Sequence, residues 1–204
     1  MARIAAMIRF RLSVLLLGSS LLVSAASYAQ TKPTSPLANA TVLVIRHGEK
    51  PAEGTGLTPA GEARAKAYVG FFKNLKVAGK PIHIDHIFAT KDSKNSFRER
   101  LTVEPLGKAL NLPLDLRFKN KAYDEMVKDI QTHNYGKGIL ICWHHGNIAP
   151  LVKSFGAAEN LIPGGKWPDE TFDWVVELKF DANGKLIPNQ TKTIHEHLMP
   201  TDSK

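Results

Sequence analysis

Two short apolar runs in the chain are each followed at once by a polar cluster that contains histidine. The run 40–45 ends in Arg46-His47-Gly48, and the run 138–143 ends in His144-His145-Gly146. Continuous apolar runs of this length, rich in β-branched residues, are typical of strands buried on both faces of a sheet. We therefore predict two buried strands whose carboxyl ends carry the histidines.

The segments between these strands show helical spacing. Ala63, Ala67, Phe71 and Leu75 recur every four residues after Thr58-Pro59. This predicts a helix that begins at Pro59 with Thr58 as its N-cap and stops before 79–81. Similar reasoning predicts helices over 96–110, 121–131 and 148–155, and a strand over 84–89. In the segment 174–180 every second residue is apolar, which predicts a strand with one buried face, and the turn 181–184 favours a hairpin.

Strands that alternate with helices indicate an α/β fold. We predict a three-layer domain over 40–200, with a mostly parallel sheet, helices on both of its faces and an antiparallel edge near the C-terminus. A length of 204 residues fits one such domain.

The first residues have a different pattern. Three arginines (Arg3, Arg9, Arg11) precede the apolar run 12–25, and Ala26-Ser27-Tyr28-Ala29 follows, with small residues where a signal peptidase requires them. This is the pattern of a secretory signal peptide over 1–29, and the polar residues 30–39 would then be a flexible lead-in. An uncleaved anchor helix is the alternative, although the run is shorter than the ~20 residues of a membrane span. We expect cleavage after Ala29, a periplasmic or secreted protein, and no stable membrane span afterwards.

Charge adds a modest indication about ligands. Without the predicted signal the formal charge falls from +8 to +5, because 24 of the 27 basic residues remain against 19 acidic ones. A moderate basic excess suits an anionic ligand. The chain has no dense basic stripe with interleaved aromatic residues, so we expect no nucleic-acid partner.

The candidate chemistry lies at the two histidine clusters. In open α/β sheets ligands bind beyond the carboxyl ends of the strands, so neighbouring strands would bring Arg46, His47, His144 and His145 together. A neutral imidazole is a nucleophile near pH 7, and arginine binds phosphate oxygens bidentately. The constellation therefore suits phosphoryl transfer.

Four segments resemble motifs of the histidine phosphatase (phosphoglycerate mutase-like) superfamily, in that family's order. They are Arg46-His47-Gly48 (its Arg-His-Gly signature), Leu57-Thr58-Pro59-Ala60-Gly61 (L-T-x-x-G), Arg98 to Leu106 (R-A-x-Q-T-A-E-P-L) and His145 to Pro150 (H-S-N-T-V-P). The resemblance implies that His47 carries a phosphohistidine, that Arg46 and Arg98 hold the phosphoryl oxygens, and that His145 stabilises the transferring group. It also implies that no metal or other cofactor is needed.

Three positions depart from the family pattern or leave alternatives open. Arg100 lies two residues from Arg98, and alignment to Thr102 and Pro105 favours Arg98 as the phosphate ligand. His144 stands where the family usually has a small residue, and the sequence assigns it no role. Asp124 is our candidate for the general acid, with Glu125 and Glu49 as alternatives.

The sequence thus predicts a phosphomonoester hydrolase that acts on a small phosphorylated compound through a phosphohistidine intermediate. One alternative is a catalytically weak phosphate- or partner-binding module on the same fold. A second alternative is a metal-dependent hydrolase that uses the histidine cluster.

Overall fold

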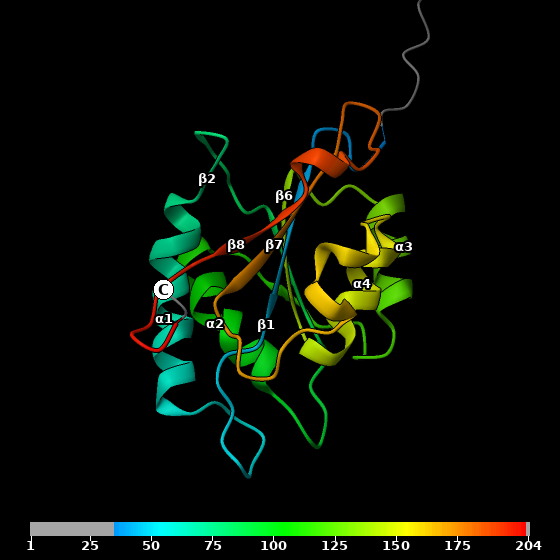
Figure 1. Ribbon diagram of the computed structural model, residues 1–204. Coiled ribbons are helices and arrows are strands. Elements are labelled where there is room, and N and C mark those ends of the chain that lie inside the picture. Colours follow the sequence, from blue (N-terminus) through cyan, green and yellow to red (C-terminus); the bar gives the residue numbers. More distant parts are fainter. Residues whose placement is uncertain (1–34, 203–204) are drawn as a thin grey trace, which may run out of the picture. The chain divides into compact units, whose positions relative to one another are not determined.

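The computed structural model describes residues 35–202 (Figure 1), so the predicted signal peptide lies outside the described residues. Ser35 to Asn39, the end of the predicted lead-in, form a turn in which Leu37 and Ala38 are buried. No helix among the described residues has the length and apolar character that a membrane span requires.

Helices and strands occur close to the predicted segments. The helices are α1 (Pro59–Asn74), α2 (Arg98–Leu110), α3 (Tyr123–Thr132) and α4 (Ile148–Ser154), with short 3-10 turns η1 (His145–Asn147), η2 (Glu159–Leu161), η3 (Pro163–Gly165) and η4 (Pro188–Gln190). The strands are β1 (Thr41–Arg46), β2 (Lys76–Val77), β3 (Lys80–Pro81), β4 (His86–Ala89), β5 (Leu114–Asp115), β6 (Gly138–Trp143), β7 (Trp174–Lys179) and β8 (Lys192–His195).

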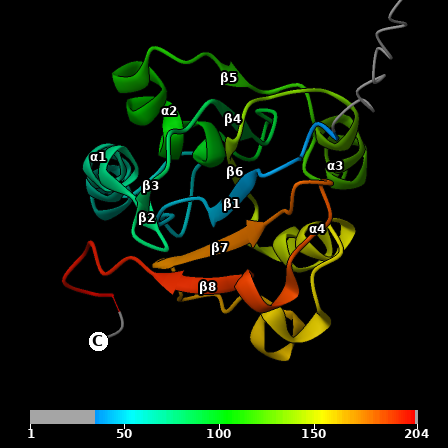
Figure 2. The same ribbon diagram turned by 90° about the horizontal axis from the view of Figure 1, so that it is seen from above.

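Six of the described strands form one sheet in the order β5-β4-β6-β1-β7-β8 (Figure 2). Strands β5, β4, β6 and β1 are parallel, whereas β7 and β8 add an antiparallel edge. The predicted mostly parallel sheet with an antiparallel C-terminal edge is therefore confirmed. The two predicted histidine-bearing strands are direct neighbours, with Arg46 at the end of β1 paired with Trp143 at the end of β6.

Helices cover both faces of the sheet. Tyr68 and Phe72 of α1 and Leu106 of α2 pack with Leu43 and Ile45 on one face. On the other face the apolar residues of α3 and α4 pack with Val42, Val44, Ile139 and Ile141. Figures 1 and 2 show α1 and α2 on one side of the strands and α3 and α4 on the other, which confirms the three predicted layers.

Strand β7 corrects one detail of the prediction. Its alternating pattern predicts one buried face, but residues 175–178 are all buried. The reason is that Val175 packs in the core beneath α1 and α2 while Val176 and Leu178 pack in the core beneath α3 and α4. The second face of this strand carries Glu177, a polar residue that is 1% exposed.

Contacts between the loop after β1 and the start of α1 explain the Leu-Thr-x-x-Gly pattern. Thr58 caps α1 by accepting a hydrogen bond from the amide of Gly61 (3.1 Å), as predicted, and its own amide donates to the carbonyl of Glu49 (2.9 Å). A β-carbon on Gly61 would lie 2.6 Å from that carbonyl oxygen. The loop after β1 therefore requires a glycine at this position in order to pack against the helix.

Candidate active site

Three histidine side chains meet where β1 and β6 end. The ring centroid of His47 lies 5.6 Å from that of His145 and 5.8 Å from that of His144, and the rings of His144 and His145 stack at 4.5 Å. One ring nitrogen from each histidine lies within 4.8 Å of those of the other two. The neighbouring strands thus bring the two predicted clusters together, and His144 joins them.

His47 is held with one ring nitrogen ready to act as a nucleophile. Its Nδ1 lies 2.7 Å from the carbonyl of Gly48, which only accepts hydrogen bonds, so Nδ1 carries the proton and Nε2 has the lone pair. Nε2 is buried and has no hydrogen-bond partner among the described residues. Burial lowers the pKa of His47 to about 3; the hydrogen bond to Gly48 opposes this shift and the positive charge of Arg46 adds to it.

His144 and His145 have the opposite tautomer. The amide of Gly146 donates to Nδ1 of His144 (3.1 Å), and Nη2 of Arg46 donates to Nδ1 of His145 (3.4 Å). Both of these N–H groups can only donate hydrogen bonds, so Nδ1 of each ring is the acceptor. The proton of each neutral ring therefore lies on Nε2. Burial lowers the pKa of His144, and burial followed by the charge of Arg46 lowers that of His145 to about 4. The site therefore offers one imidazole lone pair and two imidazole N–H donors near neutral pH.

Arg46 is buried at the centre of this arrangement. Its Nη1 donates to the carbonyls of Pro168 (3.1 Å), Asp169 (2.7 Å) and Thr171 (2.9 Å), and its guanidinium lies 3.8 Å from the ring centroid of Phe172. Burial lowers its pKa to about 10. Its Nε is buried without a hydrogen-bond partner within the described part of the chain, so this edge has a donor available for an anion.

Arg98 and Arg100 point in different directions from the start of α2. Arg98 donates to the carbonyls of Gly54 and Gly56, and its charge helps to lower the pKa of His144. Arg100 is paired with Asp92 at 2.7 Å and, along the helix, with a glutamate. Of the two arginines, Arg98 is therefore the one whose charge acts on the histidines.

Thr102 connects α2 to the loop that carries the nucleophile. Its hydroxyl accepts from the amide of Gly48 (2.8 Å) and donates to the carbonyl of Arg98 (2.7 Å). The threonine is completely buried. One side chain thus joins the backbone next to His47 to the backbone of Arg98.

Solved structures with the same fold identify this architecture. No family model matches the sequence, and no curated protein sequence matches it either. The protein histidine phosphatase SixA complexed with tungstate superposes with a TM-score of 0.52 at 18% identity, covering 76% of this chain and 97% of SixA. The chain has the histidine phosphatase fold. The predicted fold class is therefore confirmed.

Two further structures support this assignment of the fold. Bacillus stearothermophilus YhfR matches with a TM-score of 0.52 at 13% identity, over 81% of this chain and 98% of that one. A variant of Entamoeba histolytica phosphoserine phosphatase in complex with phosphoserine matches with a TM-score of 0.51 at 13% identity, over 78% and 98%. At these identities the matches establish the histidine phosphatase fold and leave the activity to be argued from the site.

The three predicted candidates for the general acid lie elsewhere. Glu49 pairs with Arg64 of α1 at 2.7 Å, and Asp124 of α3 is exposed and bonds the hydroxyl of Ser154. Glu125 is exposed on α3. No hydrogen bond or ion pair within residues 35–202 joins any of the three to the histidines.

Two other acidic residues, which the sequence patterns did not single out, lie beside the cluster. The carboxylate Oδ1 of Asp169 is 3.3 Å from Nε2 of His145. Glu99 is 3% exposed and accepts from the hydroxyl of Ser96 (2.9 Å), and its negative charge raises the pKa of His144 against the effect of burial. Asp169 lies on a polar loop without a motif, and Glu99 stands where the family pattern has alanine, so local sequence gave no functional signal for either.

The three imidazoles also form the kind of cluster that binds transition metals. The hydrogen bonds do not fit this use, because the Nδ1 lone pairs of His144 and His145 already accept from N–H groups and their Nε2 atoms carry protons. The positive charges of Arg46, Lys50 and Arg98 all act on His144. The site is better suited to an anion than to a cation.

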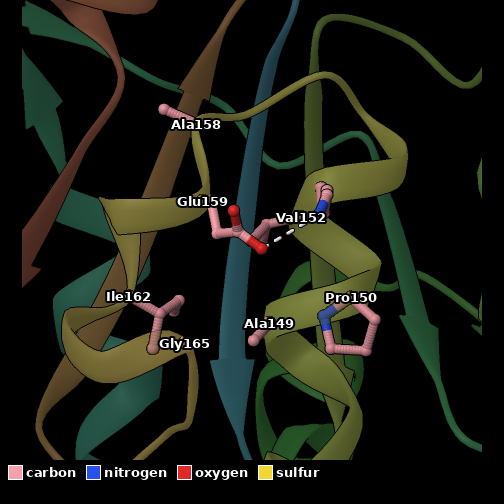
Figure 3. A pocket seen from close by; sticks show the side chains of 8 residues that line it. Ala149, Pro150, Val152, Ala158, Glu159, Ile162 and Gly165 are labelled. Atoms are coloured by element: carbon pink, nitrogen blue, oxygen red, sulfur yellow. Dashed lines mark hydrogen bonds and ion pairs between the residues drawn. The ribbon is translucent and has the colours of Figure 1, made fainter.

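Two pockets among the described residues are not lined by any of the three histidines. Figure 3 shows a pocket of about 220 Å³ between α4 and the η2–η3 segment, where Lys153 and Glu159 form an ion pair at 3.1 Å. A second pocket, of about 480 Å³, is lined by Glu49, Arg64 and Phe172 among others. Phe172 lines this pocket and also contacts the guanidinium of Arg46.

Proposed function

We propose that this protein is a phosphomonoester hydrolase that acts on a small phosphorylated compound through a phosphohistidine intermediate. The observation that carries the proposal is the set of three tautomers: Nε2 of His47 has a free lone pair, while Nε2 of His144 and Nε2 of His145 carry protons. A phosphoryl group needs this combination of one nucleophile and several donors to its oxygens.

The reaction would proceed in two displacements at phosphorus. In the first, Nε2 of His47 forms a bond to phosphorus as the ester P–O bond breaks, and the leaving oxygen takes a proton. Arg46, Arg98 and the Nε2–H groups of His144 and His145 hold the equatorial oxygens, on which negative charge is spread in the transition state. In the second step water attacks the phosphohistidine, and inorganic phosphate leaves with His47 regenerated.

The fixed geometry supports this sequence of steps. Since His47 is neutral down to a low pH, no base is required to activate it. The hydrogen bond from Nδ1 to Gly48 stabilises the positive charge that forms on the ring when Nε2 bonds to phosphorus. The buried guanidinium of Arg46 places a permanent positive charge beside the reacting group.

The experiment is the hydrolysis of 4-nitrophenyl phosphate by the purified protein together with trapping of the intermediate. We expect turnover, an acid-labile and base-stable phosphoprotein after rapid quenching, and loss of both in His47→Ala. His83→Ala is the matched control, because His83 is an exposed histidine outside the cluster. Turnover that persists in His47→Ala would exclude the proposed intermediate.

The same assay separates the alternatives. The alternative of a binding module without turnover is supported by the position of the predicted acids, which lie away from the histidines. Such a module would bind vanadate without releasing nitrophenol. A metal-dependent hydrolase would lose activity in strong chelator. We expect activity that resists chelator and is blocked by vanadate.

We propose further that the protein is exported, as the signal-like pattern of residues 1–29 predicts. Expression of the full chain in a bacterial host, followed by fractionation and N-terminal sequencing, tests this. The expected product is periplasmic and begins at Gln30. A product that retains Met1 and sediments with membranes would support the anchor alternative instead.

A further inference from the structure

The loop that covers Arg46 is built around a tight turn. The amide of Thr171 donates to the carbonyl of Pro168 (3.3 Å), and the indole N–H of the fully buried Trp167 donates to the carbonyl of Thr171 (2.8 Å). Nη1 of Arg46 donates to three carbonyls of the same turn. The position of residues 168–171 is therefore fixed from inside the protein by Trp167 and Arg46.

The two acidic residues of this turn face different surroundings. The carboxylate of Asp169 lies 3.3 Å from Nε2 of His145 and 3.8 Å from the ammonium of Lys166, and its side chain is 65% exposed. Glu170 instead lines the pocket that contains Glu49 and Arg64. Asp169 thus combines contact with a phosphate-binding histidine and access to solvent.

On the basis of the proposed function, we propose that Asp169 is the general acid that protonates the leaving group. In the first step the ester P–O bond breaks, the leaving oxygen takes the proton of the Asp169 carboxyl, and Nε2 of His47 bonds to phosphorus. In the second step the Asp169 carboxylate takes a proton from water as its oxygen attacks the phosphohistidine. The carboxyl group is then restored, so protons balance over one turnover.

The surroundings of Asp169 fit this role better than those of the other acids. The Nε2–H group of His145 lies beside a phosphoryl oxygen in the proposed complex, so the Asp169 carboxyl, 3.3 Å from that nitrogen, lies beside the ester. General acid catalysis requires the Asp169 carboxyl to carry a proton before the ester P–O bond breaks. Solvent access allows that proton to be supplied from water, whereas Glu99 is 3% exposed and bonded to Ser96.

The test compares two esters that differ in their need for acid catalysis. 4-Nitrophenyl phosphate releases a stable phenolate, while glycerol phosphate releases an alkoxide that must be protonated. For Asp169→Asn we expect kcat/KM for glycerol phosphate to fall by about 100-fold or more, the range of general acid catalysis, and that for the aryl ester by about 10-fold or less. The rates should also depend more steeply on leaving-group pKa across a series of aryl phosphates.

Glu170→Gln is the matched control, because it removes the carboxylate of the next residue in the same turn. For this variant, kcat/KM for both esters should stay within about 2-fold of the wild-type value, as expected of an exposed substitution without a catalytic role. Vanadate inhibition measured for both variants shows whether the phosphate site is still formed. If Asp169→Asn lowers kcat/KM for both esters by the same factor, or changes neither value, Asp169 is not the acid.

Failure of this inference is distinguishable from failure of the proposed function. If His47→Ala abolishes hydrolysis of both esters while Asp169→Asn leaves their ratio unchanged, the phosphohistidine mechanism stands and the acid is another group. If His47→Ala retains turnover, both proposals fail together. A loss of the glycerol phosphate activity in Asp124→Asn but not in Asp169→Asn would assign the acid to α3 and overturn the inference.

Discussion

Arg46 and Asp169 are joined through the main chain: Nη1 of the arginine donates to the carbonyl of the aspartate at 2.7 Å. The two residues are 123 positions apart in the sequence. The arginine that would bind phosphate is thus also the residue that places the turn 168–171 over the site. A defect in this side chain should therefore affect folding stability as well as catalysis.

Arg46→Lys tests that double role. A lysine cannot donate to three carbonyls of the turn and to His145 at once, and it loses the planar contact with Phe172. We expect aryl phosphate hydrolysis to fall by about 100-fold or more and the free energy of unfolding to fall by about 2–4 kcal/mol, as for a buried charged group with lost hydrogen bonds. Urea unfolding measures the second effect.

The control for this substitution is Arg100→Lys. Arg100 forms partly exposed ion pairs, for which about 0–1 kcal/mol is typical. It should unfold at nearly the wild-type urea concentration. Equal stability of the Arg46→Lys variant and the wild type would contradict a stabilising role for the hydrogen bonds from Arg46 to the turn 168–171.

Arg98 and Arg100 provide a second comparison. Because the charge of Arg98 acts on His144, Arg98→Ala should lose about 100-fold or more in kcat/KM, as expected on removal of a group that holds the phosphoryl oxygens in the proposed function. Arg100→Ala should lose less than about 5-fold, since its partners are partly exposed carboxylates outside the histidine cluster. Steady-state kinetics with one aryl ester are sufficient, and the reverse order would overturn the alignment of this helix with the family motif.

The pH dependence should show that His47 is a buried neutral imidazole. Burial lowers its folded-state pKa to about 3, below the ordinary value of 6.5, so the unfolded chain binds the extra proton first. Stability from this group is therefore fully present above pH 6.5 and is lost as the pH falls towards 3, by about 1.4 kcal/mol per pH unit. Unfolding free energies at pH 4, 5 and 6 should show a slope that is smaller in His47→Gln.

The same shift predicts the pH profile of the chemistry. Since the nucleophile is still unprotonated at pH 5, kcat/KM for 4-nitrophenyl phosphate should not fall between pH 7 and 5 through protonation of His47. A tenfold loss in that range with a titration near 6.5 would indicate that the ring is open to water and charged. The measurement needs constant ionic strength, because several positive charges surround the site.

The sheet and its two layers of helices could be predicted because their signals are local. The runs 40–45 and 138–143 mark buried strands, Thr58-Pro59 marks the start of a helix, and the rule that ligands bind at strand ends brings His47 and His145 together. The burial of both faces of β7 could not be predicted, because it depends on which helices pack against that strand. Glu177 is a polar residue on the second face of this strand, so the sequence pattern does not indicate that this face is buried.

The position of Asp169 could not be predicted from the sequence for a related reason. An acidic residue between Pro168 and Glu170 has the composition of an ordinary exposed turn. Its place beside His145 depends on hydrogen bonds from Arg46, a residue on a strand far away in the chain. Asp124, the predicted acid, bonds the hydroxyl of Ser154 instead, and its local sequence does not indicate this contact.

A cluster of carboxylates around Arg64 should make stability decrease at high pH. Arg64 contacts Glu49, Glu196 and Asp202, three carboxylates around one buried guanidinium. Burial raises the pKa of Glu196 to about 8, against the attraction of Arg64 and with the repulsion of Asp202. The folded state therefore holds a proton on Glu196 that the unfolded chain, with an ordinary pKa of 4.5, has already released.

The sign of the effect follows from this difference. The contribution of Glu196 is present in full below pH 4.5 and is lost as the pH rises through 8. The histidines with lowered pKa values contribute the opposite slope near pH 6.5, where the unfolded chain still holds part of their protons. The difference between the wild type and Glu196→Gln therefore reports on Glu196. Thermal unfolding at pH 6.5, 7.2 and 8 should show a falling Tm in the wild type and a flatter one in Glu196→Gln, where an amide cannot ionise. If the Tm of the wild type rises over this window, Glu196 is ionised in the folded protein and the ion pair with Arg64 outweighs its burial.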